Sequence, residues 1–135
     1  MKVLVTDTVS EAGISLLRKE KDLQVEVRLG FSRDELLEAV AGADGMLTRS
    51  GTPLDAEVLG AAKKLRAVAR AGVGVDNIDL AAASRRGIVV INAPTGNTLA
   101  ATEHTLAMML SLVRKVPQAW NSLSMGEWKR SRFMG

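Results

Sequence analysis

Short apolar runs alternate with segments of helical periodicity along the first part of the chain. The apolar runs predict strands at residues 2–6, 23–29, 45–48, 65–69 and 88–91. Apolar residues spaced three and four apart predict helices at residues 10–20, 32–41, 53–62 and 80–86. Because strands and helices alternate, the pattern predicts an α/β fold with a doubly wound parallel sheet.

Local signals support two of these helices. Ser32, with Glu35 three residues later, matches a capping box, in which each side chain bonds the other residue's backbone N–H. In the first predicted helix we expect Ile14, Leu16 and Leu17 to face the sheet.

The pattern changes after residues 94–97. A long helix is predicted from residue 98 to about residue 116, and its apolar residues lie nearly all round, which is typical of a helix buried on several sides. The tail interleaves apolar and basic residues, with no compact element to cover them. One small flavodoxin-like sheet cannot cover this surface. We therefore expect one domain over residues 1–95, an incomplete second domain over 96–135, and a missing domain or subunit that covers the helix.

The net charge of +3 does not come from a basic face on the predicted sheet domain. Residues 114–135 contain five basic residues and one acid, whereas residues 1–113 contain thirteen basic and fourteen acidic residues. Binding of nucleic acid needs a basic patch on the folded body, so nucleic acid is not an expected partner. The chain has no cysteine, and no apolar run approaches the roughly 20 residues that span a bilayer. We expect a cytoplasmic protein without a membrane contact.

Chemistry-bearing residues follow two neighbouring strands, where ligands bind in sheets of this kind. They are two arginines, a serine and a glycine loop: Arg49, Ser50, Arg70, Gly72, Val73 and Gly74. Guanidinium, hydroxyl and free backbone N–H groups bind anions, so we expect a phosphate or carboxylate here. Two structural alternatives stay open. Arg49 could be a solvated loop arginine, and the glycines could form a tight turn with a positive φ at Gly72 or Gly74.

The glycine loop does not match a dinucleotide-binding loop. That loop needs a third glycine three residues after Gly74, where this chain has Asn77. It also needs an acid at the end of the next strand for the ribose, and residues 92–94 contain none. We therefore expect a short backbone nest for an anion.

Other polar residues carry weaker signals. Asn97 either contacts a ligand or caps the long helix. His104 has no second histidine or nucleophile at a useful spacing, so we expect a packed helix histidine and no metal site. A phospho-receiver would need paired acids after its first strand and an aspartate after its third. The chain offers a single Asp7 and then a cationic site around Arg49, which argues against that class.

The chain resembles the D-isomer-specific 2-hydroxyacid dehydrogenases over essentially its whole length. The resemblance rests on residues 70–79, 87–98 and 101–105, with Thr48, Arg49 and Ser50 before them and 117–119 and 126–128 after them. The segments 75–77 and 94–98 favour the branch of the family that acts on 3-phosphoglycerate over the glyoxylate, lactate and formate branches.

The resemblance implies a division of roles. Residues 1 to about 95 would be most of a substrate-binding domain, and residues from about 96 would begin a truncated Rossmann domain for NAD. The implied substrate-binding residues are Arg49, Ser50, Arg70, Gly72, Val73, Gly74 and Asn97, and the implied cofactor-binding residues are Val73 and Thr102. The family's catalytic arginine, glutamate and histidine would follow residue 135, so this chain by itself is expected to be inactive. Residues 98–135 would form a homodimer or homotetramer contact.

Two alternatives remain beside this hypothesis. The chain could belong to another D-2-hydroxyacid dehydrogenase, because a phosphate and a carboxylate both suit an arginine. It could also be an anion-binding or dimerising module without catalysis.

Overall fold

The computed structural model describes residues 1–134. The chain divides after Gly96 into two compact units, Met1–Gly96 and Asn97–Gly135. The substrate-binding and nucleotide-binding roles of the two parts stay predictions. Within the described residues, no helix combines the length and apolar character needed to cross a bilayer.

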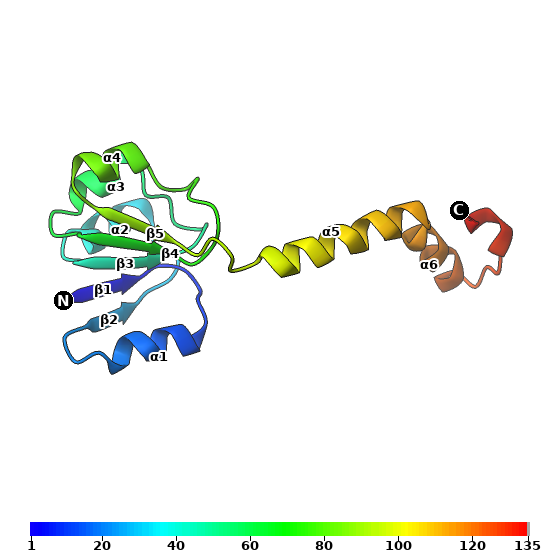
Figure 1. Ribbon diagram of the computed structural model, residues 1–135, viewed down its shortest axis with the longest axis horizontal. Coiled ribbons are helices and arrows are strands. Elements are labelled where there is room, and N and C mark those ends of the chain that lie inside the picture. Colours follow the sequence, from blue (N-terminus) through cyan, green and yellow to red (C-terminus); the bar gives the residue numbers. More distant parts are fainter. Residues whose placement is uncertain (135) are drawn as a thin grey trace. The chain divides into compact units, whose positions relative to one another are not determined.

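Five parallel strands form one sheet in the first unit (Figure 1), in the order β2-β1-β3-β4-β5. Their bounds are β1 (Lys2–Val5), β2 (Gln24–Val27), β3 (Gly45–Thr48), β4 (Ala67–Arg70) and β5 (Val89–Asn92). The strand order reverses beside β1, which is the doubly wound, flavodoxin-like arrangement that the alternating pattern predicts. The carboxyl ends of all five strands therefore lie along one edge of the sheet.

Four helices connect these strands, and each begins at a side-chain cap. They are α1 (Glu11–Lys19), α2 (Arg33–Val40), α3 (Ala56–Ala61) and α4 (Leu80–Arg85). Ser32 and Glu35 form the predicted capping box at α2, and the carboxylate of Asp55 accepts from two backbone N–H groups at the start of α3. These bonds satisfy N–H groups that have no partner inside the helix.

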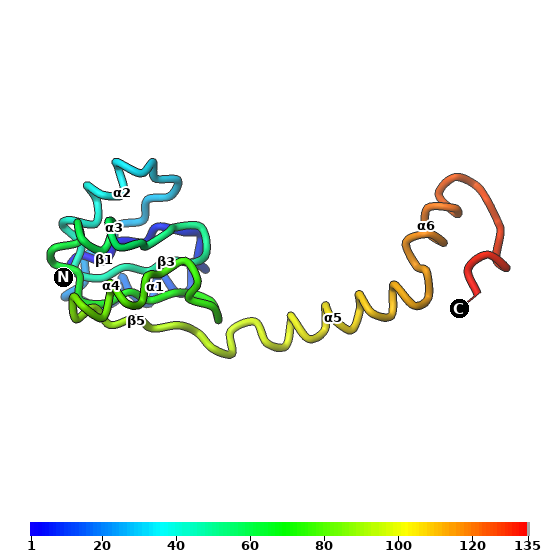
Figure 2. The backbone as a smooth tube through the Cα atoms, turned by 90° about the horizontal axis from the view of Figure 1, so that it is seen from above, coloured from blue at the N-terminus to red at the C-terminus, as the bar shows by residue number. Residues whose placement is uncertain are grey.

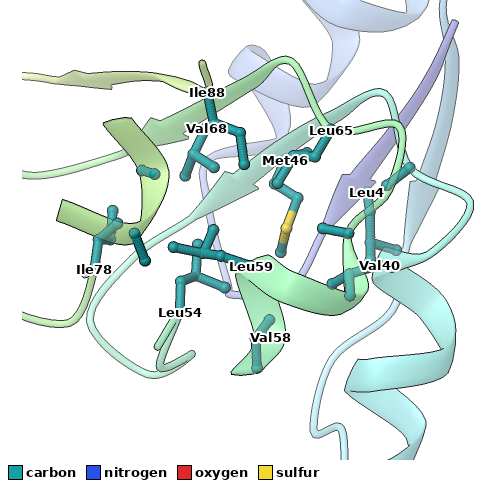
Figure 3. Close-up of a cluster of buried hydrophobic side chains, with 14 of the residues drawn as sticks. Leu4, Val40, Met46, Leu54, Val58, Leu59, Leu65, Val68, Ile78 and Ile88 are labelled. Carbon is teal, nitrogen blue, oxygen red and sulfur yellow. The ribbon is translucent and has the colours of Figure 1, made fainter. Parts of the chain in front are cut away.

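The hydrophobic core lies between α2, α3 and α4 and one face of the sheet (Figure 3). That face is formed by Leu4, Met46 and Val68, which occupy level positions on β1, β3 and β4. Val40 of α2 and Leu59 of α3 pack against it and are fully buried. The packed core fixes the sheet, and the sheet fixes the loops at its carboxyl edge.

The opposite face of the sheet is covered unevenly. Ile14 of α1 and Val5 of β1 are buried, whereas Val89 and Ile91 of β5 are exposed. The expectation that Leu16 faces the sheet is wrong, because its side chain is 64% exposed. Successive helical residues turn by about 100°, so Leu16 points away from the stripe that Ile14 begins.

The second unit contains three helical segments: α5 (Thr98–Val113), α6 (Val116–Ser124) and the 3-10 helix η1 (Arg130–Phe133). The prediction of one helix that reaches about residue 116 is therefore wrong at its end. Lys115 has a φ of 53°, and the backbone turns there between α5 and α6 (Figure 2). Pro117 explains the break, because proline has no N–H for the preceding turn and is tolerated in the first turn of a new helix.

Helix α5 has no buried residue, although its composition predicts burial on several sides. Leu99, Leu106, Leu110 and Leu112 are all more than half exposed. The missing domain or subunit that the sequence predicts to cover this helix stays a prediction.

We expect two leucine truncations to differ in their effect on the free energy of unfolding, because one lies in the core and the other at the surface. Leu59→Ala should lower the free energy of unfolding by about 2–5 kcal/mol, because Leu59 is fully buried. The control Leu16→Ala should change it by less than about 0.5 kcal/mol. Urea denaturation of the 135-residue chain followed by circular dichroism measures both values, and equal losses would contradict the placement of the core.

Candidate functional site

Three neighbouring strands end level with one another at the carboxyl edge of the sheet. Thr48 of β3 pairs with Arg70 of β4, and Arg70 pairs with Asn92 of β5. The backbone N–H of Ala71 donates to the carbonyl of Thr48 at 2.8 Å, so the loops after β3 and β4 leave the sheet together. The structure thereby places Arg49 and Ser50 on the same edge as Arg70 and its glycine loop.

A carboxylate from the end of β1 organises the loop that carries Arg49 and Ser50. Oδ2 of Asp7 accepts hydrogen bonds from Thr48 Oγ1 at 2.8 Å, from the N–H of Arg49 at 2.7 Å and from the N–H of Thr52 at 3.2 Å. Partial burial would raise the pKa of Asp7, but these hydrogen bonds outweigh it and hold the pKa below its ordinary value of 3.8. The loop therefore closes around an ionised carboxylate.

Arg49 and Ser50, which this carboxylate network holds through the loop backbone, are both exposed. Nη1 of Arg49 donates to the carbonyl of Thr8 at 3.3 Å, and the guanidinium makes no ion pair within residues 1–134. A guanidinium has five N–H donors, so most of them stay available to an anion.

Asn77 ties the same loop to the loop that follows β4. Its Nδ2 donates to the carbonyls of Arg49 and Thr52, both at 2.7 Å. This is the position where a dinucleotide loop would have its third glycine. An asparagine that joins two loops of the site replaces the glycine that would pack a helix against a strand.

Two charged side chains explain why the loop contains glycines. A Cβ at residue 72 would collide with Nη1 of Arg70, and a Cβ at residue 74 would lie 2.8 Å from Oδ1 of Asp76. Neither Gly72 nor Gly74 has a positive φ, so the alternative of a positive-φ turn is wrong. The glycines make room for charged side chains.

The Arg70 guanidinium is largely covered and weakly neutralised. Its side chain is 11% exposed, and Nη2 lies 4.0 Å from Oδ1 of Asp76, at the limit of an ion pair. Nε of Arg70 is buried without a hydrogen-bond partner within the described chain. A partly buried cation attracts an anion more strongly than a solvated one, because the local dielectric constant is lower.

Asn92 and Ala93 hold the glycine loop at its far side. Nδ2 of Asn92 donates to the carbonyl of Val73 at 2.7 Å, and the N–H of Ala93 donates to the carbonyl of Gly72 at 3.0 Å. Both loop carbonyls are thus turned toward β5. Val73 itself is 39% exposed at the surface of the loop.

The loop does not fit a dinucleotide. Helix α4, which follows it, is capped by Asp79, whose carboxylate accepts from the N–H of Ala82 at 2.8 Å. A carboxylate therefore occupies the helix start that would have to hold a pyrophosphate. Together with Asn77, this feature supports the rejection of a nucleotide loop at residues 70–79.

The remaining predicted site residues belong to the second unit. Asn97 precedes α5 at its cap position, but its side chain makes no capping hydrogen bond. The Thr102 hydroxyl donates to the carbonyl of Thr98 at 2.8 Å, inside its own helix. His104 is exposed within the described residues, like the rest of α5. No cluster of metal-ligating side chains occurs in the part of the chain that the structure describes.

Sequence reasoning missed Asp7 and Asn77 as organisers of the site. Asp7 follows the first strand closely, and a polar residue at a strand end is the same signal that marks Arg49 and Arg70. The dinucleotide motif marks Asn77 only as a missing glycine. Neither set of hydrogen bonds can be read from local spacing, because the partners of Asp7 lie 41 to 45 residues away and Arg49 lies 28 residues from Asn77.

Comparison with known families gives one consistent result. The family model described as D-isomer specific 2-hydroxyacid dehydrogenase, catalytic domain, matches residues 3–129. The D-3-phosphoglycerate dehydrogenase of Archaeoglobus fulgidus is 53% identical over 135 residues, covering 100% of this chain and 25% of the relative. The D-3-phosphoglycerate dehydrogenase of Mycobacterium bovis is 50% identical, covering 98% of this chain and 25% of the relative. The chain thus spans about a quarter of the length of these relatives.

Solved structures share the fold. A protein of Thermus thermophilus matches with a TM-score of 0.85 and 40% identity, over 96% of this chain and 42% of that chain. The NAD⁺-bound 3-phosphoglycerate dehydrogenase of Entamoeba histolytica matches with a TM-score of 0.76 and 30% identity, over 85% of this chain and 40% of that chain.

The lowered pKa of Asp7 predicts an acid-dependent loss of stability. Because the pKa is lower in the folded chain, the ionised carboxylate stabilises the fold fully above its ordinary value of 3.8, and this contribution is lost as the pH falls through the folded-state pKa. Asp7→Asn removes the ionisation. The difference in free energy of unfolding between wild type and variant, measured by urea denaturation, should therefore be constant above about pH 5 and shrink as the pH falls below 3.8. A difference that is independent of pH would contradict this assignment.

Proposed function

This chain belongs to the D-isomer specific 2-hydroxyacid dehydrogenase family, and we propose that it is the N-terminal part of a D-3-phosphoglycerate dehydrogenase. The whole protein would oxidise the C2 hydroxyl of 3-phosphoglycerate to the ketone of 3-phosphohydroxypyruvate, with NAD as the hydride acceptor. The observation that carries the proposal is the 53% identity to such an enzyme along all 135 residues. The cationic edge of the sheet supports it with a site of suitable charge.

The geometry suits a substrate with an anionic group at each end. Arg49 and Ser50 would hold the phosphate, because an exposed guanidinium and a neighbouring hydroxyl can both donate to its oxygens. Gly72, Val73 and Gly74 would meet the carboxylate through their backbone. Arg70, behind the loop, adds positive charge to that end of the site.

The cofactor would be bound mainly by residues outside this chain. The loop at residues 70–79 does not fit a dinucleotide, and the sequence contains no Gly-x-Gly-x-x-Gly run. When bound, NAD would supply the hydride acceptor that no side chain can provide. Val73 and Thr102 are the residues of this chain that we propose to lie toward it, and Asn97 the one that contacts substrate from the second unit. The described chain by itself would bind and orient the acid without turnover.

A second candidate function is binding or association without catalysis. The observation that favours it is the exposed apolar surface of α5, which includes Leu106, Met109 and Leu110. We propose that residues 98–135 form a homodimer or homotetramer contact, because a second copy would remove this surface from water. Such a module would bind an anion with no hydride chemistry anywhere in the whole protein.

Substrate titration of the 135-residue chain tests the role of Arg49. Arg49→Ala should weaken 3-phosphoglycerate binding by about tenfold or more, because a charge-assisted contact is lost. The affinity for D-glycerate, which lacks the phosphate, should change little on the same substitution. The control Arg18→Ala removes an equal charge from α1 and should leave both affinities unchanged. Unchanged 3-phosphoglycerate affinity in Arg49→Ala, measured by calorimetry or amide chemical shifts, would remove Arg49 from the site.

The coding sequence that follows codon 135 tests the proposal for the whole protein. We expect a strand and a Gly-x-Gly-x-x-Gly loop in frame, followed by the family's catalytic arginine, glutamate and histidine. A coding sequence without that loop would favour the binding module over the dehydrogenase.

A further inference from the structure

Two aspartates flank the cationic edge, and their surroundings differ. Asp7 accepts three hydrogen bonds from the loop that carries Arg49 and is partly buried. Asp76 has a side chain that is 84% exposed and lies 4.0 Å from Nη2 of Arg70. Within residues 1–134 it accepts no hydrogen bond through its carboxylate. Both carry negative charge beside a site that should attract anions, so each opposes binding through its charge.

The Asp7 carboxylate fills the inside of its loop. Its three donors, one hydroxyl and two backbone N–H groups, come from Thr48, Arg49 and Thr52, which span the loop from end to end. Gly51 is compatible with this filling only because it has no side chain, since a Cβ there would collide with Oδ1 of Asp7. The loop is therefore shaped around the carboxylate.

Other contacts hold Arg49 at further atoms. Its carbonyl accepts from Nδ2 of Asn77 at 2.7 Å, and its Nη1 donates to the carbonyl of Thr8 at 3.3 Å. With the bond from its N–H to Asp7, the residue is tethered at its backbone N–H, its carbonyl and its guanidinium. A side chain held in this way loses less conformational freedom when it binds a ligand.

We propose that Asp7 is a positioning residue of the anion site, whose carboxylate holds residues 48–52 so that Arg49 and Ser50 meet an anion in one geometry. The inference rests on the proposed function, because it assumes that this edge binds an anionic substrate. The proposal predicts the direction of the effect on affinity. The carboxylate of Asp7 strengthens binding of the anion although it lies beside the site, because its effect on the loop geometry exceeds its repulsion of the anion. Asp76, which does not hold the loop, has the opposite effect.

Paired alanine substitutions in the 135-residue chain test the direction in which each aspartate changes the affinity for the anion. Asp7→Ala and Asp76→Ala each remove one negative charge and truncate the same side chain. Asp7→Ala should weaken 3-phosphoglycerate binding by about tenfold, because Arg49 and Ser50 lose their fixed positions. Asp76→Ala should strengthen it, by up to about threefold, because the change removes repulsion at an exposed site together with the weak neutralisation of Arg70. Tighter or unchanged binding by Asp7→Ala would overturn the proposal.

A conservative variant and a second measurement distinguish a loss of positioning from unfolding of the chain. Asp7→Asn keeps an oxygen that can accept from the loop, so its affinity should lie between those of wild type and Asp7→Ala. Amide hydrogen exchange at Arg49 and Thr52 should be at least about tenfold faster in Asp7→Ala than in wild type, with exchange in β1 and β4 unchanged. Equal exchange at these two amides in wild type and Asp7→Ala would overturn the proposal.

The same measurements distinguish a failure of the proposed function from a failure of the positioning role of Asp7. If the wild-type chain binds no 3-phosphoglycerate while the exchange rates change as expected, the proposed substrate fails and the role of Asp7 in the loop stands. If wild type binds and Asp7→Ala binds equally well, the proposed function stands and the positioning role fails.

Discussion

Parallel pairing in one register brings Thr48, Arg70 and Asn92 level with one another, and the site depends on that alignment. A shift of one residue in β4 would turn Arg70 to the opposite face of the sheet. The guanidinium would then leave the loop whose glycines make room for it. The buried face formed by Leu4, Met46 and Val68 sets the register, so the apolar core determines where the charges lie.

Features that depend on nearby residues could be predicted from the sequence. The alternation of strands and helices specified the sheet, because each element has its own hydrophobic period. The capping box of Ser32 and Glu35 could be recognised because its partners are three residues apart. Arg49 and Arg70 could be placed at one edge because parallel strands end on the same side of a sheet.

Features that depend on distant contacts could not be predicted. The role of Asp7 follows from hydrogen bonds to a loop more than 40 residues away, and no local pattern marks them. Asn77 could be judged only against the dinucleotide motif that it fails to match. Leu16 shows a limit of a different kind: composition does not distinguish an apolar residue that points away from the buried stripe of a short helix from one within the stripe.

The long sequence separations within the site have a consequence for folding. The contacts of Asp7 with the loop after β3 cross 41 to 45 residues, so they form only when β1 and β3 have paired. Contacts with such separations are acquired slowly, because the intervening chain must first be closed into a loop. A chain emerging from the ribosome would therefore present an organised Arg49 only once its sheet is assembled. Any ligand that needs this geometry would bind the completed fold selectively and shift the folding equilibrium toward it.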